Sequence, residues 1–207
     1  MLPRLVLIAD RFSEGEVSER VVEAGLAGAP WLVLRDRAAG GESFARAAER
    51  LVGRLRALAD PPLVSITANL HVAHALQTNL HLGSGDASII EAVRALDAGA
   101  VIGYSAHDVH EAREAAEAGA DYLFFSPVFA TSSKPGVMGA GIDSLAQVVE
   151  AVADVPIFAL GGVTPERVRP CLEAGAHGVA VLSGVFGEAD PAEAARRYLK
   201  EVTAPSL

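Results

Sequence analysis

Eight short apolar runs alternate with helical patterns along the whole chain, and this alternation constrains the fold more than any other feature. The runs are nearly continuous in apolar residues and rich in valine, isoleucine and leucine, which is typical of parallel strands covered on both faces. The predicted strands span residues 5–9, 31–34, 63–67, 79–82, 101–104, 122–125, 156–159 and 178–182. The predicted helices span residues 18–27, 43–58, 71–76, 88–96, 109–118, 142–152, 165–174 and 191–202.

Several predicted helices end in a similar Ala-Gly motif, as at Ala24-Gly25 and Ala118-Gly119. Glycine after a helix supplies the left-handed C-cap, and the small residues let the chain turn directly into the next strand. Repeated joints of this kind in a chain of 207 residues predict an α/β fold, a single (β/α)8 TIM barrel over residues 1–207. A doubly wound open sheet is the alternative.

The composition limits the partners of the chain. It is 51% hydrophobic, and 17 basic against 26 acidic residues give a net charge of −9. An acidic chain without a basic cluster argues against nucleic acid and anionic membranes as partners, although a local positive charge can still bind a small anion. The first apolar run is too short for a signal segment or a spanning helix, so we expect a cytoplasmic protein.

The single cysteine, Cys171, lies inside a helical pattern. It cannot form an internal disulfide, and a reducing compartment is compatible with it. We interpret it as a small buried apolar residue rather than a nucleophile. A homo-oligomer is compatible with a barrel of this size, but no patch in the sequence specifies one.

Polar residues follow the predicted strands, whereas the connections from helix to strand consist mainly of small residues such as alanine and glycine. In a (β/α)8 barrel the carboxyl ends of the strands carry the functional residues. The polar residues at these positions include Asp10, Arg35, Arg37, Asn69, Asp86, Ser105 and His107. This asymmetry between the two ends of the barrel predicts a catalytic face.

The segment after the sixth predicted strand changes from apolar residues to hydroxyls, one lysine and turn residues. Thr131, Ser133 and Lys134 together have the donors to surround a phosphate or diphosphate. A solvated serine and threonine turn is the alternative interpretation.

Glycines follow the last two predicted strands, at Gly161-Gly162 and Ser183-Gly184. Glycine there lets backbone N–H groups approach a ligand closely, and barrels often bind phosphate after these two strands. We therefore predict a phosphate site at these residues.

Three further residues have an open interpretation at this stage. Arg35 either binds an anion or pairs with a neighbouring aspartate, Asp36 or Asp10. Asp86 either holds Mg²⁺ weakly or caps a turn and the helix after it. His107 is the best general-base candidate, because it follows Ser105 at a strand end. The candidate catalytic residues are therefore His107, Ser105 and Lys134.

The motifs after the predicted strands also form a recognisable series. They read, in chain order, Arg35-Asp36-Arg37, Asn69, His81-Leu82-Gly83-Ser84-Gly85-Asp86, Gly103-Tyr104-Ser105-Ala106-His107, Ser126-Pro127-Val128-Phe129-Ala130-Thr131-Ser132-Ser133-Lys134, Gly161-Gly162-Val163-Thr164-Pro165 and Val179-Ala180-Val181-Leu182-Ser183-Gly184. Over nearly the whole chain, this series resembles the thiamine phosphate synthase / TenI family.

The resemblance implies a (β/α)8 barrel and two branches of function. The synthases join a hydroxymethylpyrimidine diphosphate to a thiazole phosphate and release pyrophosphate, with Mg²⁺. The TenI-type proteins bind a thiazole phosphate carboxylate, and some aromatise it by proton transfer. By resemblance, Gly162 and Ser183 would hold the thiazole phosphate, and Asp86 would be one of two magnesium aspartates. The residues that would hold the pyrimidine diphosphate are Arg35, Arg37, Asn69, Ser105, Thr131, Ser133 and Lys134.

The sequence departs from the family patterns at several positions. Synthases commonly have glutamine, glutamate and lysine where this chain has Val33, Asp36 and Arg37, and they carry the second aspartate where it has Leu70. Leucine cannot ligate Mg²⁺. Pro127 replaces the tautomerase histidine, and proline cannot transfer a proton.

The segments 136–141 and 183–198 resemble TenI, so we expect a TenI-like protein that binds thiazole phosphate and has a tautomerase-type activity. A thiamine phosphate synthase and a non-catalytic thiazole phosphate-binding protein are the alternatives. Another phosphate-binding barrel enzyme, such as an aldolase, is a further one.

Overall fold

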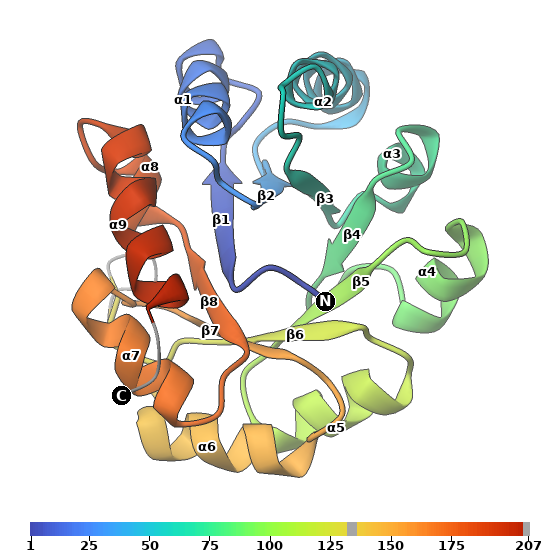
Figure 1. The fold of residues 1–207 in the computed structure, drawn as a ribbon. Helices are drawn as coiled ribbons and strands as arrows, with labels where there is room; N and C mark the ends of the chain where they lie inside the picture. The colour runs from blue at the N-terminus through green and yellow to red at the C-terminus, as the bar shows by residue number, and fades with distance from the viewer. Residues whose placement is uncertain (132–135, 205–207) are drawn as a thin grey trace.

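The computed structural model describes residues 1–131 and 136–204, and its eight strands close into one parallel barrel in chain order (Figure 1). The strands are β1 (Leu5–Asp10), β2 (Trp31–Arg35), β3 (Leu63–Thr67), β4 (Asn79–Leu82), β5 (Ile102–Ala106), β6 (Tyr122–Phe125), β7 (Ile157–Leu160) and β8 (Gly178–Val181). The predicted TIM barrel is confirmed, and the pairing of β1 with β8 excludes an open sheet.

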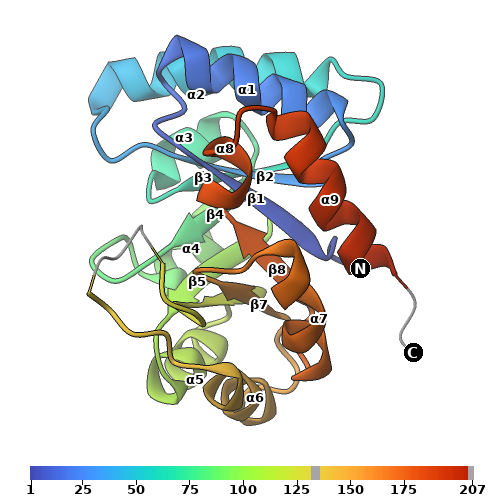
Figure 2. The ribbon, with the colours of Figure 1, turned by 90° about the vertical axis from the view of Figure 1, so that its left-hand side faces the viewer.

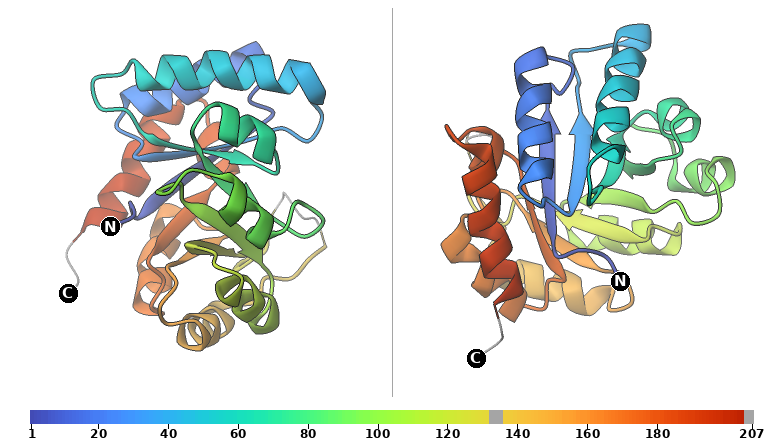
Figure 3. Two further views of the ribbon diagram at one scale, coloured as in Figure 1. Left: turned by 90° about the vertical axis from the view of Figure 1, so that its right-hand side faces the viewer. Right: turned by 45° about the horizontal axis from the view of Figure 1, so that its top comes forward.

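The helices form an outer ring around the barrel (Figures 1 and 3). They are α1 (Gly15–Leu26), α2 (Gly41–Arg56), α3 (Leu70–Ala75), α4 (Ile89–Ala95), α5 (Val109–Glu117), α6 (Ile142–Ala151), α7 (Pro165–Glu173), α8 (Ser183–Phe186) and α9 (Pro191–Thr203). The short α8 was not predicted, because four residues are too few to show a helical period. The N-terminus and the end of α9 lie at the same end of the barrel (Figure 2).

Local sequence accounts for several helix starts. Ser88 and Glu91 form a reciprocal capping box at the start of α4. Asp108 and Asp190 accept hydrogen bonds from backbone N–H groups at the starts of α5 and α9. In the part of the chain that the structure describes, no helix is long and apolar enough to cross a membrane.

The barrel interior is a separate core from the layer between strands and helices. Its buried residues are Val6, Ile8, Trp31, Val33, Tyr122, Phe124, Phe158 and Ala180. Trp31 packs edge-on against Tyr122, with ring centroids 4.7 Å apart. These large rings fill the middle of the barrel, so the space available to a ligand lies above them, at the carboxyl ends of the strands.

Candidate active site

A cavity of about 890 Å³ opens at the carboxyl ends of the strands. This volume lies in the range of small-molecule sites. The predicted site residues that line it are Arg35, Arg37, Asp86, Ser105, His107, Thr131, Gly161, Gly162, Ser183 and Gly184. Ser133 and Lys134 lie outside the described residues.

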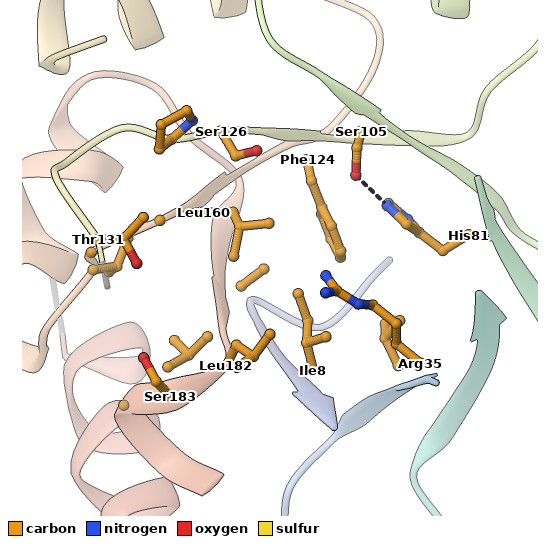
Figure 4. Close-up of a pocket in the computed structure, with 18 of the residues that line it drawn as sticks. Ile8, Arg35, His81, Ser105, Phe124, Ser126, Thr131, Leu160, Leu182 and Ser183 are labelled. Atoms are coloured by element: carbon orange, nitrogen blue, oxygen red, sulfur yellow. Dashed lines mark hydrogen bonds between the residues drawn. The ribbon is translucent and has the colours of Figure 1, made fainter. Parts of the chain in front are cut away.

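Two polar sides of this cavity face each other across an apolar floor (Figure 4). Arg35, His81 and Ser105 lie on one side, and Thr131 and Ser183 lie on the other. Ile8, Phe124, Leu160 and Leu182 lie between them. This arrangement suits a ligand with anionic groups at its two ends and flat, apolar rings between them.

The question of which aspartate pairs with Arg35 is settled by strand pairing. The β1–β2 register places Asp10 beside Arg35, and Arg35 Nε lies 3.1 Å from Asp10 Oδ1. The guanidinium is about one-third exposed at the cavity, so the ion pair orients it without burying it. Arg35 therefore pairs with Asp10 and still lines the cavity.

Asp36 turns away from Arg35 and organises the loop after β2. Its carboxylate accepts hydrogen bonds from Ser13 Oγ and from the backbone N–H groups of Ala38 and Ala39. Burial by itself would raise the pKa of Asp36, but the hydrogen bonds from Ser13, Ala39 and Ala38 outweigh it and hold the pKa below its usual value. Asp36 is thus a fixed anion that supports the Arg35–Arg37 loop.

Asn69 is not among the lining residues, which differs from its prediction as a ligand residue. Its Oδ1 accepts from Val72 N at 3.1 Å and caps α3. The cap uses the amide oxygen, whereas an anionic ligand would accept from the Nδ2 hydrogens of the same amide, so the cap fixes the side chain without using its donors. Leu70, the next residue, packs on the hydrophobic core between strands and helices.

Asp86 and Leu70 do not fit a magnesium site built from two carboxylates. Asp86 Oδ2 accepts a hydrogen bond from Gly83 N at 2.7 Å, which is the turn role that the sequence had left as an alternative. Leu70 contributes no oxygen. Across residues 1–131 and 136–204, no three His, Cys, Asp or Glu side chains gather to hold a metal ion. The described chain supplies one carboxylate for Mg²⁺ at this place, and we derive no chemical step through the metal.

His107 lies at the cavity rim. Its Nδ1 lies 3.0 Å from Glu111 Oε2, and the same carboxylate accepts a hydrogen bond from the His107 backbone N–H. A carboxylate that orients an imidazole is the arrangement that general-base histidines use. The geometry is therefore compatible with the predicted base without assigning a reaction to it.

His81 is a site residue that the sequence analysis did not select. It is buried at the end of β4, and its Nε2 lies 2.8 Å from Ser105 Oγ (Figure 4). Its ring stacks on Phe124, with centroids 4.1 Å apart. Burial lowers the pKa of His81 to about 3, so the imidazole is neutral. A histidine inside an apolar strand gave no signal of this contact, because its partners come from other strands.

Gly161 and Gly162 have positive φ angles of 96° and 63°. A Cβ on Gly161 would lie 2.7 Å from Pro127 Cβ, and one on Gly162 would lie 2.4 Å from the Ala130 carbonyl oxygen. Both glycines are thus required for the β7–α7 turn to pack against the loop after β6. Arg167, at the start of α7, adds a cation–π contact to the same loop, with its guanidinium carbon 4.6 Å from the Phe129 ring centroid.

The fold and the site define a (β/α)8-barrel protein with a ligand cavity at the carboxyl ends of its strands. Residues 5–185 match the family described as thiamine monophosphate synthase. The chain belongs to this family, which confirms the resemblance drawn from the motifs.

Individual relatives agree with this assignment. A thiamine-phosphate synthase from Natronomonas pharaonis is 38% identical, over 92% of this chain and 90% of that protein. One from Salinibacter ruber is 45% identical, over 72% of this chain and 66% of that protein, just under two thirds of its length. Thiamine phosphate pyrophosphorylase from Pyrococcus furiosus superposes with a TM-score of 0.83 at 30% identity, over 96% of this chain and 95% of that chain.

Proposed function

We propose that the protein is a thiamine phosphate synthase, a transferase that joins hydroxymethylpyrimidine diphosphate to thiazole phosphate and releases pyrophosphate. The observation that supports it is the cavity with two polar sides across an apolar floor. Its relatives that bear the synthase name favour this function over the TenI-like tautomerase that the motifs predict.

The two sides of the cavity receive different substrate groups in this proposal. Arg35, Arg37 and Ser105 face the diphosphate, while Gly162 and Ser183 face the thiazole phosphate. The apolar floor supports both rings and brings them together, which turns an encounter of two molecules into a reaction within one complex.

In this proposal, the protein accelerates the reaction by stabilising the departing pyrophosphate. When the bond between the pyrimidine methylene carbon and the diphosphate oxygen breaks, the bonding electron pair leaves with pyrophosphate, and the lone pair of the thiazole ring nitrogen forms the new bond to that carbon. Guanidinium and hydroxyl donors aimed at that oxygen stabilise the charge that develops there. Arg35 is already oriented by its ion pair with Asp10, so little reorganisation accompanies the reaction.

The test is synthesis of thiamine phosphate from the two substrates with Mg²⁺ present, measured by chromatography. We expect turnover in the wild type and a loss of roughly tenfold or more in Arg35→Gln, the size expected for one charge-assisted contact. Arg46→Gln is the matched control, because Arg46 pairs with Glu42 on the outer surface of α2. No thiamine phosphate from the wild type would overturn the proposal.

A thiazole tautomerase is the second candidate, and the His107–Glu111 pair is the observation that favours it. Isomerisation of thiazole phosphate carboxylate is measured in parallel, with His107→Gln as the variant. Isomerisation without synthesis would restore the TenI-like reading. Thiazole phosphate binding with turnover in neither assay would favour a non-catalytic binding protein.

A further inference from the structure

A continuous line of buried polar groups runs from the barrel interior to Ser105. Trp31 Nε1 donates to Ser65 Oγ at 2.9 Å, and Ser65 is in turn the side-chain partner whose hydrogen bond acts to lower the pKa of the Tyr122 phenol, against the larger effect of burial. The Tyr122 hydroxyl lies 3.0 Å from His81 Nδ1, and His81 Nε2 lies 2.8 Å from Ser105 Oγ. We call these five residues the interior relay.

The first three members are closed off from solvent, and the fourth is nearly so. Trp31, Ser65 and Tyr122 have no exposed surface, and His81 is 4% exposed. His81 and Ser105 line the cavity, whereas the other three members do not. Buried polar groups in a place this apolar must satisfy one another, because no water competes for them.

Tryptophan sets the direction of the hydrogen bonds, because an indole N–H can donate but cannot accept. Ser65 Oγ accepts from Trp31, and its own hydrogen is then donated to the Tyr122 oxygen. Tyr122 in turn donates to His81 Nδ1, so the single hydrogen of the neutral imidazole is on Nε2 and is donated to Ser105 Oγ.

The reverse direction is unfavourable. Ser65 would then accept from both Trp31 and Tyr122, and its own hydrogen would need another acceptor. In the described part of the chain, Ser65 Oγ has no such acceptor. A buried hydroxyl hydrogen without a partner is costly, so the order from Trp31 to Ser105 is the one that uses every donor.

We infer that Trp31, Ser65, Tyr122 and His81 are positioning residues that hold the Ser105 hydroxyl as a donor pointing into the cavity, toward an oxygen of an anionic ligand. Because His81 occupies an acceptor position of Ser105 Oγ, the remaining hydrogen is free to bind the ligand. The identification of that ligand as the diphosphate rests on the proposed function; the direction of the relay does not.

Burial also keeps the relay uncharged. It lowers the pKa of His81 to about 3 and raises the pKa of Tyr122 well above its usual value. A neutral relay neither gains nor loses a proton near neutral pH. The Ser105 donor therefore keeps its direction while the ligand binds.

The first test is the tautomer of His81 in the wild-type protein. Nitrogen-15 NMR of histidine-labelled protein distinguishes a protonated ring nitrogen from an unprotonated one, and the spectrum of His81→Gln identifies the His81 signals. We expect a neutral ring protonated at Nε2. A ring protonated at Nδ1, or an imidazolium, would overturn the inference without any need for an active enzyme.

The second test is a double-mutant cycle with inorganic pyrophosphate as the probe, measured by calorimetry with Mg²⁺ held constant. Ser105→Ala and Tyr122→Phe should each weaken binding by roughly five- to tenfold, the size of one hydrogen bond to a charged group. The double variant should be no weaker than Ser105→Ala, because Tyr122 acts only through Ser105. Tyr104→Phe is the control and should bind as the wild type does, since Tyr104 is outside the relay.

Each result has a defined meaning. Additive losses in the double variant, or no pyrophosphate binding to the wild type, would overturn the ligand-directing role. Protonation at Nε2 with coupled losses, but without synthesis of thiamine phosphate, would overturn the proposed function and support the relay. If Tyr122→Phe does not fold, the tautomer of the wild type still decides the direction of the relay.

Discussion

The ring of Tyr122 occupies the space that a side chain on Gly103 would need. A Cβ at Gly103 would lie 2.0 Å from Tyr122 Cζ, although the two residues sit side by side on neighbouring strands. The barrel interior thus contains this large ring only because the position next to it has no side chain. The same ring carries the hydroxyl that contacts His81.

Gly103→Ala should therefore destabilise the protein by about 1–3 kcal/mol through overpacking. Urea unfolding measures the effect, with Trp31 as the reporter, because it is the single tryptophan and packs on Tyr122. Gly53→Ala is the matched control: a Cβ there meets no atom within 4 Å, and Gly53 lies inside α2. That change should stabilise the protein by about 0.5–1 kcal/mol. Equal effects at the two glycines would contradict the overpacking argument.

His81 should make the protein lose stability on mild acidification. Its pKa is about 3 in the folded protein, against about 6.5 in an unfolded chain. Between these values the unfolded chain binds a proton that the folded protein does not, so the free energy of unfolding falls as the pH falls. The slope approaches about 1.4 kcal/mol per pH unit for this one group.

His81→Gln should remove that part of the slope between about pH 6 and pH 4, as measured by urea unfolding at several pH values. His110→Gln is the control, because His110 is exposed on α5 beside Glu114. The same slope in the wild type and in His81→Gln would show that His81 is not the acid-sensitive group.

Leu70→Asp should let the protein use Mg²⁺ at a lower concentration. It adds a carboxylate at the first position of α3, where a negative charge is favourable next to the helix N-terminus. In the synthesis assay, the Mg²⁺ concentration for half-maximal rate should fall by roughly tenfold, as expected for a second carboxylate ligand. Leu70→Asn controls for the lost apolar contact without adding charge. An unchanged Mg²⁺ requirement in Leu70→Asp would argue that this position does not limit metal use.

Cys171 should be unreactive toward thiol reagents in the folded protein. It is buried in α7, and burial raises the pKa of its thiol to about 11, so almost none of it is the reactive thiolate at pH 8. Labelling with a disulfide reagent should be slow in buffer and fast in denaturant, with Cys171→Ala as the blank. Rapid labelling of the folded protein would mean that α7 opens readily.

Local pattern was enough to predict where most strands and helices lie. The strand at β6 and the helix at α9 differ from their expected bounds by no more than one residue at either end. By contrast, α1 begins three residues before its predicted start at Ser18, because the turn before it carries no side-chain cap to mark the boundary. The cavity lining was largely predictable, since the carboxyl ends of parallel strands meet at one end of a barrel.

The contacts within the site were less predictable. Asn69 is predicted to bind a ligand, and nothing in the sequence analysis indicated that its amide oxygen also caps α3. Arg35 had two candidate partners, and only the register of β1 against β2 selects Asp10. The role of His81 is not visible in the sequence, because nothing around it indicates a partner such as Tyr122, 41 residues away.

The order of strands and helices, the polar end of the barrel and the family follow from local sequence, because periodicity, caps and motifs involve neighbouring residues. Which of those polar residues act on one another depends on how the strands pack. Barrel closure brings β2, β3, β4, β5 and β6 around one interior, where Trp31, Ser65, Tyr122, His81 and Ser105 must satisfy one another in the absence of water. Hydrogen-bond direction is a property of that shared interior, and no single segment of the chain contains it.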